Sequence, residues 1–173
     1  RVLALVIPVV VAGVATLLAA CISYGQSAHS TEDAAALAGL LFGMILAERF
    51  PVPVEGVDAG GVSLGFVFAV AAILLFGWQA GVIVAAGGPT VTHLIGHRPP
   101  LRVAYNGSMF ALAALAAGLL VEQIPESSIG ALIARLALGA FVYFWVVNPV
   151  LIRAVLAVSA GKPFFKLIWE NAK

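Results

Sequence analysis

Residues 2–25 read VLALVIPVVVAGVATLLAACISYG and contain no charged side chain. A helix needs roughly 20 predominantly apolar residues to cross the ~30 Å hydrocarbon core of a bilayer, and this run is long enough. Of the 173 residues in the chain, 62% are hydrophobic and only 10% are charged. A soluble domain has about 25% charged residues. Because so few charged groups cannot cover a water-soluble fold, we predict an all-α polytopic membrane protein with no nucleic-acid partner.

Further apolar runs follow the first, separated by glycine- and proline-rich or polar segments that interrupt helices. They cover residues 31–48, 62–76, 80–96, 103–121 and 129–158. Ser30 and Asp33 have the spacing of a capping box at the start of the second run, and a tight turn is expected at Gly77–Gln79. We therefore predict a domain of six transmembrane helices over residues 1–160. An interfacial amphipathic segment is expected over residues 161–173, leading into a further region.

The positive charges predict the orientation, because lysine and arginine concentrate in cytoplasmic loops. Eight of the nine basic residues fall on the side of the two termini: Arg1, Arg49, Arg98, Arg102, Arg153, Lys162, Lys166 and Lys173. The ninth, Arg135, lies in the last run and is expected to reach outward to Glu122 or Glu126. We predict a multi-pass protein of the bacterial inner membrane with both termini in the cytoplasm.

Prolines and small residues predict how the helices bend and pack. Pro8, Pro89 and Pro149 lie inside apolar runs and are expected to kink their helices. Faces of small residues let membrane helices approach closely. Such faces occur at Gly39 and Gly43, and at Ala114 and Gly118. They favour packing within one bundle, with a homodimer or a partner membrane subunit as the alternative.

Polar side chains gather in the fourth and fifth runs. Thr90, Thr92 and His93 follow Pro89, where a proline leaves a backbone carbonyl unpaired. Asn106 and Ser108 lie early in the next run. Asn106 is expected to bond to Thr90, Thr92 or His93 as a link between helices, which is the favoured interpretation. The alternative is a small-molecule site formed by these five residues.

Other chemistry finds little support in the sequence. His93 and His97 have the four-residue spacing of metal ligands, but no third ligand is evident, so neither a metal nor a cofactor is predicted. Ser108 lacks the context of a catalytic nucleophile. Glu48 stands alone at the end of its run and is expected to pair with Arg49 or Arg102. We do not expect these residues to form an enzyme.

The segment RPPLRVAYN (98–106), which leads into FALAALAAG (110–118), resembles part of a known bacterial family. It is similar to the N-terminal membrane sensor regions that precede HD-GYP or GGDEF signalling domains. Residues 161–164, GKPF, also fit that pattern, although Tyr105 stands where the family has phenylalanine. The resemblance implies a sensory or anchoring domain of a larger protein, with an output domain beyond Lys173.

The chain also resembles the substrate-binding subunits of energy-coupling-factor vitamin transporters in its size, its expected six helices and its alanine-rich first run. Such a subunit would end near Lys173, whereas a sensor would continue. A third alternative is a structural membrane scaffold, whose thermal stability no small molecule would shift. The function predicted from the sequence is a membrane sensor or anchor, with the transporter subunit as the alternative.

Overall fold

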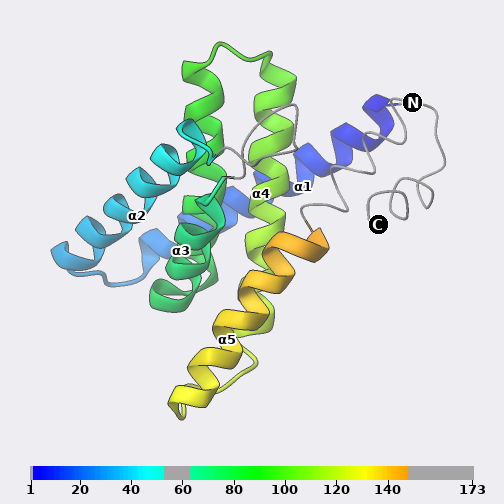
Figure 1. The fold of residues 1–173 in the computed structure, drawn as a ribbon. Helices are drawn as coiled ribbons and strands as arrows, with labels where there is room; N and C mark the ends of the chain where they lie inside the picture. Colours follow the sequence, from blue (N-terminus) through cyan, green and yellow to red (C-terminus); the bar gives the residue numbers. More distant parts are fainter. Residues whose placement is uncertain (1, 53–62, 148–173) are drawn as a thin grey trace.

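The computed structural model describes residues 2–52 and 63–147, and this part of the chain is predominantly helical. The helices are α1 (Val2–Gln26), α2 (Thr31–Arg49), α3 (Gly65–Ile95), α4 (Pro100–Val121) and α5 (Ile129–Phe141). A π-helix, η1 (Val142–Val147), continues directly from α5 (Figure 1). The predicted all-α class is confirmed.

The start of α2 confirms the predicted cap. The Ser30 hydroxyl accepts a hydrogen bond from the Asp33 backbone N–H at 3.0 Å, and the Ser30 N–H donates to the Asp33 carboxylate at 3.0 Å. These two bonds satisfy two backbone N–H groups that the start of a helix otherwise leaves to water.

Helix α3 folds back on itself at Gly77. Gly77 has φ 84° and ψ 178°, a region of backbone space that is essentially restricted to glycine. Gly65 and Gly88 both lie against Met44, although a straight helix would separate them by roughly 34 Å. The α3 segment is therefore a hairpin of two antiparallel arms, residues 65–76 and 78–95. The tight turn predicted at Gly77–Gln79 is confirmed.

The chain reversal within α3 falls at a glycine and not at a proline. Pro8 and Pro89 lie inside α1 and α3. The non-helical dihedral angles within α3 fall at Gly77, twelve residues before Pro89. Glycine has no Cβ and can reverse the chain there, whereas a proline can stay inside a membrane helix when its neighbours accommodate the freed carbonyl. Pro149 lies outside the described residues.

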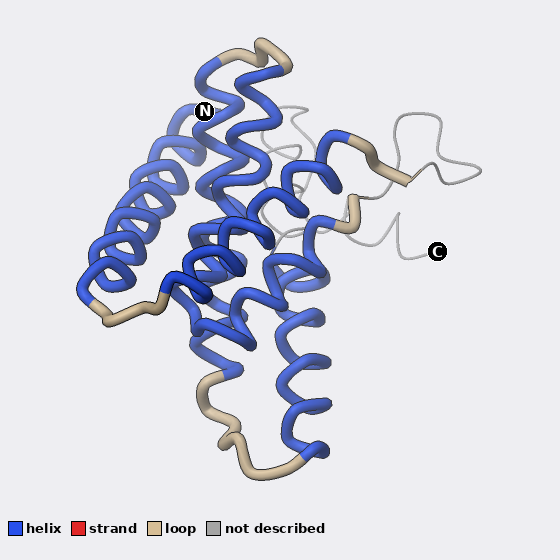
Figure 2. Tube along the Cα trace, turned by 90° about the vertical axis from the view of Figure 1, so that its left-hand side faces the viewer, coloured by secondary structure: helices blue, strands red, loops and turns tan. Residues whose placement is uncertain are grey.

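The core lies between the second arm of α3 and α4, which run side by side (Figure 2). Its fully buried residues are mostly alanine and valine, so the two backbones can approach closely. They include Val82, Ala85 and Ala86 of α3 and Ala111, Ala114, Ala117 and Val121 of α4. Helix α1 crosses α4 and the second arm of α3, α2 packs on α3, and α5 with η1 covers another face of α3 and α4.

The outer faces are apolar. On α1, Leu3, Ile7, Val11, Leu18 and Ile22 are each more than half exposed. Three helices are long and apolar enough to cross a bilayer: Leu3–Gln26, Gly65–Ile95 and Pro100–Val121. These features identify a helical membrane protein. The last run begins at Ile129 as predicted and is described as far as Val147, while the segment predicted over 161–173 lies outside the described residues.

Candidate functional site

Two of the predicted site residues lie in contacts between helices. The Ser108 hydroxyl on α4 donates a hydrogen bond to the Val10 carbonyl on α1 at 3.3 Å. Gly13 lies directly against the Ser108 backbone, so close that an added methyl group would overlap it. Thr90 packs against Gly107, where an added Cβ would be 2.5 Å from the Thr90 hydroxyl. Ser108 and Thr90 therefore hold α1, α3 and α4 together.

The other predicted residues do not converge with them. Thr92 Oγ1 and His93 Nδ1 are buried and have no hydrogen-bond partner among the described residues. In the same part of the chain, no side-chain hydrogen bond joins Asn106 to Thr90, Thr92 or His93. Asn106 lies one turn before Phe110, whose ring stacks on Tyr143 at a centroid distance of 6.2 Å. The contacts among the described residues therefore do not gather these five side chains into one site.

Three of the four predicted packing residues form contacts within the chain. Gly43 lies against the ring of Phe68, Ala114 is fully buried, and an added Cβ at Gly118 would be 2.9 Å from Trp78 Cα. Gly39 is different, because no atom lies within 4 Å of the position of an added Cβ.

A polar cluster that the sequence did not predict surrounds Glu48, at the end of α2. The Ser63 hydroxyl donates a hydrogen bond to Glu48 Oε1 at 2.5 Å and accepts one from the Gly65 N–H at 3.0 Å. The expected pairing of Glu48 with Arg49 or Arg102 is therefore wrong. The Arg49 guanidinium instead lies 5.5 Å from the Phe50 ring centroid, where it remains exposed to solvent.

The direction of the helices brings a second hydroxyl to this cluster. Phe68 meets Gly43 and Ser63 meets Glu48, so α2 runs antiparallel to the first arm of α3. It therefore runs in the same direction as the second arm, as Figure 1 also shows. Met44 of α2 packs on Gly88 of α3. Glu48 and Thr92 each lie one turn further along their own helix. This register places Thr92 at the same level of the bundle as Glu48.

The π-helix η1 supplies a third hydroxyl. Tyr143 is 1% exposed, and its hydroxyl has no partner among the described residues. Ser63, which bonds to Glu48, lies three residues before Phe66, the residue that η1 contacts. The Phe144 ring lies 5.4 Å from that of Phe66, which brings η1 against the start of α3. We call Glu48, Ser63, Thr92 and Tyr143 the Glu48 cluster.

The sequence contained one usable signal for this cluster. An ionisable residue at the end of an apolar run is commonly functional and faces the bundle interior, and Glu48 fits that description. Ser63 and Tyr143 carry no such signal, because their proximity to Glu48 depends on the α3 hairpin and on the packing of η1.

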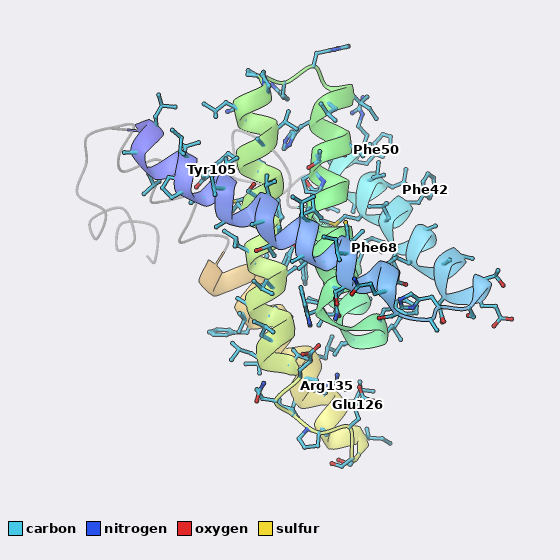
Figure 3. All side chains as sticks on the ribbon, turned by 180° about the vertical axis from the view of Figure 1, so that it is seen from behind. Phe42, Phe50, Phe68, Tyr105, Glu126 and Arg135 are labelled. Carbon is cyan, nitrogen blue, oxygen red and sulfur yellow. The ribbon has the colours of Figure 1, made fainter. Side chains whose placement is uncertain are left out.

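An ion pair lies at the other end of the bundle. The Arg135 guanidinium on α5 contacts the Glu126 carboxylate, as the prediction for Arg135 anticipated (Figure 3). The Arg135 side chain is 9% exposed and that of Glu126 is 71% exposed. Glu126 lies in the turn between α4 and α5, so the pair anchors α5 to that turn.

No family model, curated protein or solved structure matches the chain. Among the described residues, no group of three or more histidine, cysteine, aspartate or glutamate side chains could hold a metal ion. The Glu48 cluster, with one carboxylate and three hydroxyl groups, has the chemistry of a site for a small charged or polar species.

Proposed function

We propose that the chain is the membrane-embedded sensor or anchor domain of a bacterial signalling protein, located in the inner membrane, rather than an enzyme. The observation that supports this proposal is the packing of η1 against the start of α3, close in sequence to Ser63 and its bond to Glu48. Tyr143 joins the polar interior of the bundle to the last described helix. A change of charge at Glu48 would therefore act on η1.

π-Helical turns are often found at functional sites, because their wider hydrogen-bonding pattern is less stable than that of an α-helix. Residues 142–147 form such a turn, and it carries the buried Tyr143 hydroxyl. A small free-energy difference is enough to shift an element between two conformations. The π-helix is therefore suited to respond to what occupies the Glu48 cluster.

The topology proposed with this function has six spans and both termini in the cytoplasm. Two observations support it. The α3 segment is a hairpin and so accounts for two of the predicted runs. The loop 96–99, which contains Arg98, and the loop 122–128, which contains Glu122 and Glu126, lie at opposite ends of the bundle (Figure 1). Arg102 follows the first of these loops.

Cysteine labelling tests this topology. In a Cys21→Ser background, A28C and S127C should react with a membrane-impermeant maleimide on intact spheroplasts. H97C should react only after the membrane is permeabilised, because its loop would face the cytoplasm. All three positions are exposed in the structure, which makes them comparable. Labelling of H97C and S127C from the same side would contradict the six-span arrangement.

Spin labels test the sensor role against that of a passive scaffold. We expect E48Q to change the distance between labels at A38C and A137C, two exposed positions on α2 and α5. The shift should be about 1–2 Å or more, the usual size of a regulatory helix movement. Pulsed electron paramagnetic resonance in nanodiscs measures it. E32Q is the control, because Glu32 is exposed at the other end of α2, and an unchanged distribution in E48Q would favour a scaffold.

A further inference from the structure

The charge of Glu48 has no counter-charge in the described structure. The ion pair found there joins Arg135 and Glu126, and Arg49, the nearest basic residue in sequence, is exposed beside Phe50. An isolated carboxylate inside a protein is costly unless it is paired or neutralised. His93, the residue after Thr92, makes no hydrogen bond or ion pair to Glu48 in the part of the chain that the structure describes.

Two hydroxyl oxygens near Glu48 also lack partners. Thr92 Oγ1 and the Tyr143 hydroxyl are buried and unpaired, although buried polar groups in proteins are nearly always hydrogen-bonded. With Ser63 Oγ and the Glu48 carboxylate, they provide four oxygen-bearing groups from α2, the residues just before α3, the second arm of α3 and η1. A proton on Glu48 would satisfy at most one of the unpaired hydroxyls.

The geometry points to a sodium-binding site formed by Glu48, Ser63, Thr92 and Tyr143. Hard cations take oxygen ligands from carboxylate, hydroxyl and carbonyl groups. One sodium ion would neutralise the single carboxylate, and each unpaired hydroxyl would gain a partner by coordinating it. A divalent cation would leave a net positive charge in a site of low dielectric constant. Glu48 is half-buried, so the ion can exchange with the medium.

This assignment names a ligand for the proposed sensor. A sensory role of the ion rests on the proposed function. The binding itself does not. It is measured on the purified chain in nanodiscs without a signalling readout. Absence of sodium binding would overturn the inference and leave the sensor role to be judged by the spin-label distances.

Thermal unfolding of the full chain in NaCl, KCl and choline chloride at equal ionic strength and pH tests the site. At a sodium concentration about 100 times the half-saturating value, the Tm should be about 5–10 °C higher than in choline chloride. KCl should have a smaller effect. Equal Tm values in the three salts, an equal effect of KCl, or stabilisation by acid alone would each overturn the sodium assignment.

Two variants and a matched control locate the binding. E48Q should abolish the sodium-dependent shift. Y143F removes only an unpaired hydroxyl, so the protein should fold normally while the half-saturating sodium concentration rises about tenfold. Y24F is the control, because the Tyr24 hydroxyl is also buried and unpaired but its ring stacks on His29 at the end of α1. If Y143F and Y24F behave alike, or if E48Q folds and keeps the shift, the inference is wrong.

Discussion

Replacing Gly13 with alanine should lower the free energy of unfolding by about 1–3 kcal/mol, although alanine is the better helix former. A Cβ at this position would overlap the backbone of Ser108, which cannot move aside as the end of a flexible side chain can. Helix α1 would have to retreat from α4, and the hydrogen bond from Ser108 to the Val10 carbonyl would lengthen. Denaturant titration of the protein in mixed micelles measures the loss.

The matched control is Gly39→Ala on α2. No atom lies within 4 Å of the added methyl group there, so the substitution should leave stability unchanged or raise it by up to roughly 1 kcal/mol through helix propensity. Equal effects of the two substitutions would contradict the close contact between α1 and α4.

Breaking the Arg135–Glu126 pair should show a strong asymmetry. We expect E126A to cost about 2–3 kcal/mol, because it leaves a guanidinium that is 9% exposed without a counter-charge. R135M should cost less than about 1 kcal/mol, because Glu126 is 71% exposed and water can solvate it. The Arg135 Nε atom is already buried without a partner, which adds to the dependence of this side chain on Glu126.

The double variant E126A/R135M completes this test. It should be more stable than E126A alone, because the unpaired buried charge is gone and methionine fills much of the same space. E32A is the control, because it removes an exposed carboxylate near the start of α2 without breaking an ion pair between side chains. Greater loss in R135M than in E126A would show that the guanidinium contributes through packing rather than through its charge.

The sequence predicted the helices well because the signals for them are local. The capping box at Ser30, the turn at Gly77 and the start of the last run at Ile129 each follow from residues adjacent in the chain. The partner of Arg135 was also predictable, because Glu126 lies nine residues earlier, across a single turn.

Contacts between distant segments were not predictable in the same way. The predicted partner of Glu48 was wrong, because Ser63 approaches Glu48 only when the first arm of α3 packs on α2. Thr92 and Asn106 lie on either side of the same turn, yet Thr92 Oγ1 has no hydrogen-bond partner among the described residues. The sequence does not give the rotation of each helix about its axis, so it does not say which of their side chains face one another. Gly13 was missed because a spacing of small residues does not indicate which face another helix will meet.

The hairpin in α3 bears on how the protein is made. Its first arm, residues 65–76, extends only about 18 Å and is shorter than the hydrocarbon layer. Gly77 joins it to the second arm without an intervening loop. The two arms should therefore leave the translocon and partition into lipid together, as one unit, rather than one after the other during synthesis.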